Sequence, residues 1–339
     1  MRTSSIVFVL ASSLSFVAAC TEHVVTQAPA SEQTPSEEQG PETGEPAPEA
    51  PAEPAGPWTE IAALPAAATS LSCPADGDVH AATAKGLYRL EGAAWKKIAD
   101  GAFDGVSLAS PTNGFAGGAG LLVQLTGAGW SKIDISSSWR VRALFTTSEG
   151  VWMAGDGFQI LGAQLPIEPK VLFVDGKDLT MPPERAYGSR LTAGTIDFVT
   201  GNDLTTVVIG GSIGVQRWNG SQWQRHDLQT YLPGVRSAAV VGSGVFATDG
   251  KEIVEPGGSA WDPRGAGRMT PEVRELVAYE RQLVGVGDDG FVLRRSSSTG
   301  DYEQLEEPAS VDLQHACVTA DGRLWVSGGT KVFRRTKTL

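Results

Sequence analysis

Short apolar stretches separated by glycine or Asp-Gly turns recur along the chain from Trp58 to the C-terminus. Examples are VHAATAKGLYRL, GFAGGAGLLVQL, VVIGGSIGVQRW and LWVSGGTKVFRR, in which a strand rich in small residues runs into a turn and then into another strand. Glycine in the turn supplies the positive φ angle that a tight hairpin needs. The pattern predicts many short antiparallel strands rather than long helices.

A second repeated feature closes each unit, usually with a tryptophan. The closing segments are WTEIA at Trp58, WKKIA at Trp95, WSKID at Trp130, LPIEP at Leu165, WQRHD at Trp223, WDPRG at Trp261 and YEQLE at Tyr302. They start 37, 35, 35, 58, 38 and 41 residues apart, so one interval carries an insertion. An all-β period of this size is typical of propeller blades. We therefore expect residues 58–339 to form a seven-bladed β-propeller of four-stranded antiparallel blades.

The two ends of the repeat region are incomplete in complementary ways. Trp58–Ala62 is a closing strand with no inner strands before it, whereas Val311–Arg335 supplies three inner strands with no closing segment after them. Joining the two ends completes one blade and removes two free sheet edges. We expect the N-terminal outer strand to complete the C-terminal blade.

The repeats also carry a family resemblance. TADGRLWVSGGTKVFRR and GVQRWNGSQW resemble the propeller repeats of two-component regulator sensor proteins and, more loosely, those of Kelch and photosystem assembly-factor propellers. The paired glycines of Kelch repeats and the Trp-Asp ending of WD repeats are not consistently present. Because functionally unrelated proteins share this repeat type, the resemblance implies the fold and not an activity.

The first twenty residues have the organisation of an export signal. Arg2 is a short positive region, Ile6–Val17 is mostly apolar but too short to span a bilayer, and VAAC ends at Cys20. VAAC resembles the lipobox of bacterial lipoproteins, which implies a signal peptide over residues 1–19 and lipidation of Cys20. In Gram-negative lipoproteins, Thr21 in place of aspartate implies the outer membrane. The alternative is an ordinary signal with an incidental cysteine.

Residues 20–57 form a distinct segment after this signal. Thr21–Pro57 contains eight Pro and eight Glu and no Lys or Arg. With almost nothing to bury, it should be a disordered tether, and an acidic binding arm is the alternative. The net charge of -12 divides into +1 on residues 1–19, -8 on Thr21–Pro57 and -5 on the remainder. A body so close to neutral lacks a basic footprint, so we expect no nucleic-acid partner.

Two cysteines follow Cys20, and both lie in predicted innermost strands. Cys73 and Cys317 each stand three or four residues before an Asp-Gly turn, in blades that the circular closure makes neighbours. Because an exported protein meets oxidising conditions, a disulfide across this seam is one hypothesis. Two small buried hydrophobic side chains are the other.

The sequence offers no strong catalytic or metal-binding signature. It lacks a G-x-S-x-G elbow, an H-E-x-x-H motif and paired cysteines at zinc spacing. The four histidines are scattered over the tether, a second strand, an outer strand and an inner strand: His23, His80, His226 and His315. We expect packed or solvated histidines, no metal and no cofactor.

Arginines recur where inner strands begin. Arg142, Arg236 and Arg274 each follow a valine at the start of an innermost strand, and Arg190 opens another strand less regularly. Turns of the same units, expected on the same face, carry aspartates: Asp156, Asp249, Asp288 and Asp289. One interpretation is a basic channel mouth that holds an anionic ligand. The interpretation we favour is that each arginine pairs with its unit's aspartate, and a calcium site at these turns is weaker still.

Two long loops are expected on the arginine face. Pro166–Ser189 includes the exposed-looking MPPERAY, with Glu184, Arg185 and Tyr187, and the second loop is Asp262–Glu272. Propellers often keep specificity in such loops. This surface is our candidate for partner binding, and an insertion without a ligand is the alternative.

The sequence as a whole favours a lipid-anchored binding or scaffolding module of the cell envelope, with a protein or glycan partner. The alternative is a propeller hydrolase or lyase acting on envelope glycans or lactones. An enzyme would need a cluster of histidines or carboxylates at the channel mouth, where this sequence offers arginines and turn aspartates.

Overall fold

The structure is a computed structural model, and the residues it describes all belong to the unit Glu53–Leu339. The described ranges are 57–75, 77–135, 137, 139–156, 170–175, 195–203, 206–212, 214–218, 223–225, 234–254, 260–261 and 271–339. The predicted signal peptide, Cys20 and nearly all of the predicted tether lie outside these ranges. Within them, no helix combines the length and the apolar character that crossing a bilayer requires.

The described chain is built from antiparallel sheets. Two early sheets contain β2 (Ala68–Ala75), β3 (Asp78–Thr83), β4 (Gly86–Glu91) and β5 (Ala94–Ala99), then β6 (Gly105–Ser110), β7 (Asn113–Gly118), β8 (Leu121–Thr126) and β9 (Gly129–Ile133). A three-stranded sheet follows, with β10 (Arg140–Thr146), β11 (Gly150–Asp156) and β12 (Lys170–Asp175).

The later sheets repeat the four-stranded plan. They contain β13 (Phe198–Asp203), β14 (Thr206–Gly211), β15 (Gly214–Trp218) and β16 (Trp223–Arg225); β17 (Ser237–Val241), β18 (Gly244–Thr248), β19 (Ile253–Val254) and β20 (Ala260–Trp261); and β21 (Val273–Tyr279), β22 (Gln282–Gly287), β23 (Val292–Arg295) and β24 (Tyr302–Gln304). A short 3-10 turn, η2 (Asp288–Gly290), joins β22 to β23. The closing sheet combines β25 (His315–Val318), β26 (Leu324–Gly328), β27 (Lys331–Arg335) and β1 (Trp58–Ile61).

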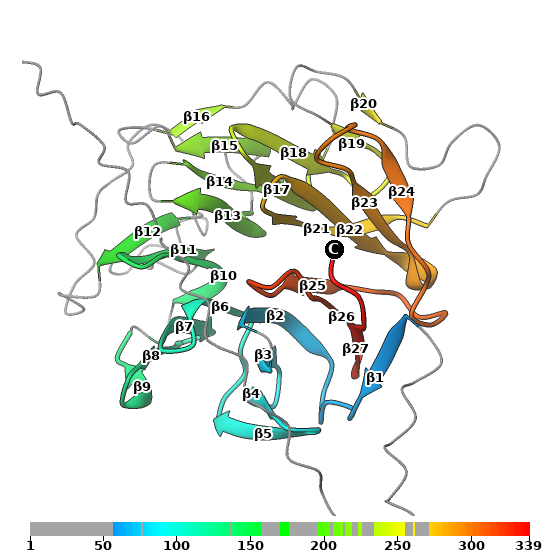
Figure 1. Cartoon of the computed structure of the whole chain (residues 1–339). Helices are drawn as coiled ribbons and strands as arrows, with labels where there is room; N and C mark the ends of the chain where they lie inside the picture. Colours follow the sequence, from blue (N-terminus) through cyan, green and yellow to red (C-terminus); the bar gives the residue numbers. More distant parts are fainter. Residues whose placement is uncertain are drawn as a thin grey trace, which may run out of the picture. The chain divides into compact units, whose positions relative to one another are not determined.

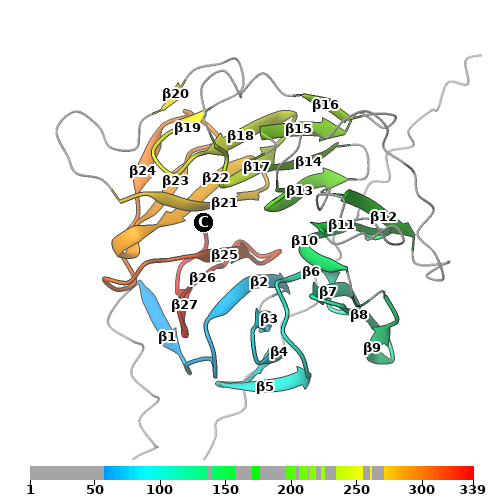
Figure 2. The same ribbon diagram turned by 180° about the vertical axis from the view of Figure 1, so that it is seen from behind.

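The sheets follow one another around a ring. The first strand of each sheet contacts the first strand of the next, in the order β2, β6, β10, β13, β17, β21, β25 and back to β2. Figures 1 and 2 show this succession from the two sides, with colours running from blue around to red. The architecture is therefore an all-β propeller, as the sequence predicted.

The number of four-stranded blades was predicted wrongly. The described residues form six four-stranded sheets, not seven, and the sheet of β10, β11 and β12 has three strands. Its third strand comes from an unexpected place, because β12 lies inside the stretch that we had interpreted as an inserted loop. The predicted closing segment LPIEP at Leu165 lies outside the described residues.

The physical reason for this correction is local sequence preference. The strand β12 reads KVLFVD, a run of β-branched and aromatic residues that favours a strand, and it pairs with β11 from Gly150↔Asp175 to Gly155↔Lys170. Leu165 had been aligned with tryptophans only by its position in the repeat.

The closure of the ring agrees with the prediction. β1 runs antiparallel to β27, from Trp58↔Arg335 to Ile61↔Val332, and lies beside it in both ribbon views (Figures 1 and 2). The Trp58 side chain is buried, and its indole Nε1 donates a hydrogen bond to the carbonyl oxygen of Glu306 at 2.7 Å. The first described strand thus completes the sheet that the C-terminal strands begin.

The hydrophobic core is divided among the seams between neighbouring sheets. One cluster packs Val79 and Tyr88 of the sheet β2–β5 against Trp325 and Val332 of the closing sheet. Glycine is required where β22 passes the entry to β21 in the same sheet, since a Cβ on Gly287 would overlap the carbonyl of Glu272. Side chains from two sheets fill each seam, so a sheet is stable only beside its neighbours.

Candidate functional site

Inner strands of neighbouring sheets are linked by side chains rather than by a shared strand ladder. A backbone N–H of one inner strand donates to a side-chain oxygen of the previous one at four places: Leu108 to Ser72 Oγ at 3.0 Å, Thr146 to Ser107 Oγ at 2.9 Å, Leu276 to Ser237 Oγ at 3.0 Å and Ala316 to Glu275 Oε2 at 2.5 Å. Each side-chain oxygen accepts from a backbone N–H that points toward the neighbouring sheet, where no strand pairs with it. The repeated contact holds adjacent sheets in register.

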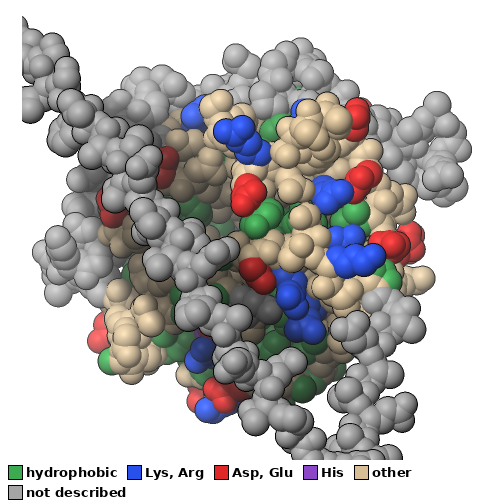
Figure 3. All heavy atoms as spheres, viewed as in Figure 1, with side chains coloured by type: hydrophobic (Ala, Val, Ile, Leu, Met, Phe, Trp, Pro, Cys, Tyr) green, Lys and Arg blue, Asp and Glu red, His purple; other side chains and the backbone are tan. Residues whose placement is uncertain are grey.

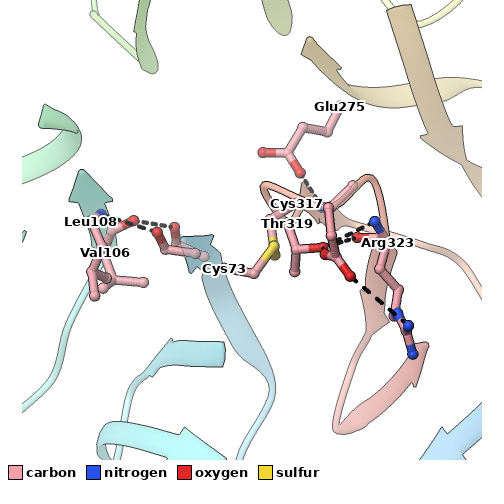
Figure 4. Close-up of a disulfide and its surroundings, with 11 residues drawn as sticks. Cys73, Val106, Leu108, Glu275, Cys317, Thr319 and Arg323 are labelled. Atoms are coloured by element: carbon pink, nitrogen blue, oxygen red, sulfur yellow. Dashed lines mark hydrogen bonds and ion pairs between the residues drawn. A yellow bond between two sulfur atoms is a disulfide. The ribbon is translucent and has the colours of Figure 1, made fainter. Parts of the chain in front are cut away.

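A covalent link occupies the seam between β2 and β25. Cys73 and Cys317 form a disulfide with a Cα–Cα distance of 5.8 Å, across a sequence separation of 244 residues. Figure 4 shows it between the Val106 and Leu108 contacts on one side and the Glu275 contact on the other. Of the two states that the sequence left open, the structure has the bonded one.

The predicted arginines lie at the start of inner strands, as expected. Arg142 and Arg274 occupy register shifts near the beginnings of β10 and β21. Arg236 immediately precedes β17, and its backbone N–H donates to Thr248 O at 2.8 Å. The guanidinium of Arg236 also covers Gly250 in its own unit's turn, which places strand entries and these turns on one face.

Carboxylates engage these arginines, and most of them come from a neighbouring sheet. Arg236 Nη1 lies 2.6 Å from Glu272 Oε2, at the entry to the next inner strand. Arg274 contacts Asp288 of its own turn, and its Nη2 lies 3.1 Å from Asp312 Oδ2 in the loop before β25. The hydrogen bond to Asp288 is the main reason that the pKa of Arg274 is raised.

A similar pair joins two other sheets. Arg140 Nε lies 2.7 Å from Asp104 Oδ2, and its Nη2 lies 3.0 Å from Asp104 Oδ1, a bidentate contact. Our favoured interpretation paired each arginine with its own unit's aspartate; among the described residues this holds for Arg274 with Asp288, whereas Arg236 pairs with Glu272 at the entry to the next inner strand. The partner was only partly predicted, because the pairs join adjacent sheets as well as turns of one unit.

The turn aspartates have structural partners. Asp249 Oδ1 accepts hydrogen bonds from the backbone N–H groups of Lys251 and Glu252, at 2.8 and 3.0 Å. Asp289 adopts a φ of 55°, and its N–H donates to Asp312 Oδ1 at 3.2 Å. Across the described ranges, no group of His, Cys, Asp or Glu side chains could hold a metal ion.

Several predicted site residues lie outside the described residues. They are Cys20, Arg190, Glu184, Arg185 and Tyr187. Residues 262–270 of the second predicted loop, Asp262–Glu272, also lie outside the described residues. The predicted partner surface on these loops therefore stays a prediction.

Sequence reasoning missed a pocket of about 410 Å³ between the sheets β2–β5 and β6–β9. Its lining includes His80, Arg89, Lys96, Lys97 and Trp130. The available signal was the similarity of WKKIA and WSKID, which places Trp and Lys on adjacent outer strands. In the sequence, those tryptophans served only to mark the closing segment of each unit.

Charged side chains do not gather by sign on the face seen in Figure 3. Lys and Arg groups lie interspersed with Asp and Glu groups over the described part of that face. This distribution matches the ion pairs above, because each pair places opposite charges side by side. It gives an anionic macromolecule no broad basic surface on this view of the described residues.

Comparison with known proteins defines the class of this chain by its fold. No family model matches the sequence, and no curated protein matches it. Among solved structures, the extracellular domain of the hybrid two component system BT3049 from B. thetaiotaomicron is similar with a TM-score of 0.61 and 11% identity, over 82% of this chain and 41% of that chain. The likeness is one of fold.

Two further structures widen the range of functions that share this fold. The WD40 β-propeller domain of Doa1 is similar with a TM-score of 0.58 and 12% identity, over 82% of this chain and 96% of that chain. A catalytically inactive virginiamycin B lyase from Staphylococcus aureus, with quinupristin, is similar with a TM-score of 0.54 and 11% identity, over 82% of this chain and 98% of that chain. The chain is a β-propeller, and its function has to be argued from its own residues.

Proposed function

We propose that this chain is an exported, lipid-anchored β-propeller that acts as a binding module in the cell envelope. The observation that carries the proposal is the disulfide between Cys73 and Cys317 in a chain that begins with a predicted export signal. Disulfides persist in oxidising compartments outside the cytosol. Extracellular bacterial domains are among the structures with a similar fold, which is consistent with this location.

The binding role is supported by the way the ring is held together. Adjacent sheets are linked by the disulfide, by hydrogen bonds such as Ser237 to Leu276, and by ion pairs such as Arg236 to Glu272. A preorganised surface loses little conformational freedom when a partner binds. Loops carried on such a ring can present a fixed constellation of contacts to a protein or glycan partner.

The anchor is tested by feeding cells an alkyne fatty acid and labelling the full-length chain. Wild type should be labelled and recovered with the outer membrane, whereas Cys20→Ser should carry no label and leave the membrane fraction. Cys73→Ser is the matched control, since it removes another cysteine and should keep the label. A labelled Cys20→Ser protein would contradict the anchor.

The partner surface is tested by cross-linking in intact cells, followed by affinity capture. The deletion should span residues 176–189, because a larger deletion would remove β12 and damage a sheet. Loss of one specific partner in this variant, but not after deletion of residues 30–50, would support the binding module. Turnover of a glycan or lactone panel by the wild type, with no captured partner, would favour an enzyme.

A further inference from the structure

The pocket between the sheets β2–β5 and β6–β9 combines an aromatic wall with converging cations. It measures about 410 Å³, which suits a small ligand. His80 lies deep in its lining, and the His80 and Trp130 ring centroids are 5.8 Å apart with the planes tilted by 59°. Ile98 and Leu125 add apolar surface. One side of a ligand could therefore pack on carbon while another meets positive charge.

The positive charge is placed against the ordinary preferences of a sheet. Arg89 on β4 and Lys96 on β5 are direct cross-strand partners, and like charges in that arrangement are destabilising. Lys97 borders the pocket as well, but it pairs with Tyr88 on the other face of the strand, where its Nζ lies 6.0 Å from the Tyr88 ring centroid, so Arg89 and Lys96 are the cations that face the pocket. A bound anion would convert this repulsion into a set of favourable contacts.

The carboxylates near these cations leave donor capacity unused. Arg89 contacts Asp78 Oδ1 through Nε at 2.8 Å, while its side chain stays 44% exposed. Lys96 pairs with Glu91 at 3.2 Å and Lys97 with Asp100 at 3.0 Å, and both lysines are well exposed. Exposed ion pairs are weak and easily exchanged for a better acceptor.

The tryptophans of the outer strands supply an independent observation. Trp58 Nε1 donates to Glu306 O and Trp95 Nε1 donates to Ala62 O, both at 2.7 Å. Trp130 holds the corresponding place in the next sheet, but no hydrogen bond of its indole N–H is found among the described residues. The Trp58 and Trp95 indoles each donate to a backbone carbonyl, whereas the Trp130 indole N–H is available to a ligand in the pocket.

The lining of this pocket contains donors and aromatic or apolar surface, and no carboxylate. A ligand that fits it presents acceptors, carries negative charge and has a ring that can lie on an indole. Sugars that carry a carboxylate have all three properties. We propose that this pocket binds an acidic saccharide of the uronate type, with Trp130 against the sugar ring and Arg89 and Lys96 around the carboxylate. The inference rests on the proposed role as a binding module.

The test is calorimetric titration of the purified propeller with three probes: glucuronate, glucose and acetate. Glucose keeps the ring without the charge, and acetate keeps the carboxylate without the ring. Glucuronate should bind with a Kd in the millimolar range or tighter, and the other two should bind at least about tenfold more weakly. No heat from glucuronate up to about 10 mM, or equal binding of glucose, would overturn the proposal.

Variants connect the binding to this pocket. Lys96→Gln and Trp130→Phe should each weaken glucuronate binding by about threefold to tenfold, because one removes a charge and the other removes only the N–H. Lys132→Gln on β9 and Trp95→Phe are the matched controls, since neither residue lines the pocket. Equal losses in variants and controls would overturn the assignment. Partner capture that survives in Lys96→Gln separates failure of this inference from failure of the proposed function.

Discussion

Two seams of the ring are closed by different means. Between β17 and β21, the Ser237 hydroxyl accepts from Leu276 N–H, two residues that stand 39 positions apart. Between β2 and β25, Cys73 and Cys317 are joined covalently across 244 positions. The first seam lies between consecutive sheets of the chain, and the second brings its ends together.

The difference teaches where a propeller is vulnerable. Closing a loop costs more conformational entropy as the loop lengthens, although the cost rises slowly. Consecutive sheets are kept near each other by short connections, and at the seam between β17 and β21 a hydrogen bond, an ion pair and a packed hydrophobic cluster set their register. The sheets at the chain ends lack that help. The interleaving of β1 with β27 and the disulfide act together at this seam.

The largest effect is expected from removing the covalent link. Cys73→Ala with Cys317→Ala should lower the free energy of unfolding by about 2–5 kcal/mol, because the unfolded chain regains the freedom of a long loop. Urea denaturation of the purified propeller measures this loss. Reduction of the wild type should reproduce it, and a change below about 0.5 kcal/mol would show that β1 pairing alone closes the ring.

The seam between β2–β5 and β6–β9 should respond to acid. Burial, opposed by the charge of Asp78 and assisted by that of Arg89, lowers the pKa of His80 from 6.5 to about 4. Between these values the unfolded chain binds more protons, so stability is full above pH 6.5 and falls as the pH drops toward 4. The contribution of His80 to this loss is about 3 kcal/mol at most.

The measurement is the free energy of unfolding at pH 7 and at pH 4.5, for wild type and for His80→Asn. Asn keeps hydrogen-bonding groups but does not titrate. The acid-induced loss should be smaller in the variant, by a large part of the His80 contribution. Identical pH dependence in both proteins would show that protonation of His80 does not lower the free energy of unfolding.

A smaller effect is expected at the seam between β17 and β21. Ser237→Ala leaves the buried backbone N–H of Leu276 without its acceptor, which should cost about 1–3 kcal/mol. Chemical denaturation measures the loss, and the exposed Ser243→Ala is the control, expected within about 0.5 kcal/mol of wild type. If Ser237→Ala behaves like that control, the side-chain link does not hold this seam.

The smallest effect is expected on the arginine face. Arg236→Gln breaks the pair with Glu272, both partly exposed, so the loss should be about 0–1 kcal/mol and should shrink in high salt. Thermal unfolding at low and high ionic strength measures it, beside the exposed Arg281→Gln. A loss that salt does not reduce would contradict a surface ion pair.

Much of the fold could be predicted because the repeat is regular. Recurring tryptophans fixed the phase, and the unpaired strand at Trp58 predicted its pairing with the residues around Val332. The failure came where the repeat lost its tryptophan, at Leu165. There the strand formed by KVLFVD would have been found from local β-preference, had the even spacing not been given more weight.

The sites were harder to predict because they depend on adjacency between sheets. The sequence placed Arg236 and Arg274 at strand entries, but it matched them with turns of their own units, whereas Glu272 and Asp312 come from the next ones. The pocket needs Arg89, Lys96 and Trp130 to meet across a seam. No spacing along a single strand contains that information.

The covalent seam is tested most directly by peptide mapping of the full-length protein, expressed with its N-terminal segment and then alkylated and digested without reduction. The disulfide across the seam between β2 and β25 predicts that the peptide containing Cys73 is recovered joined to the peptide containing Cys317. Recovery of both cysteines as separate alkylated peptides, from protein that never met a reductant, would contradict it.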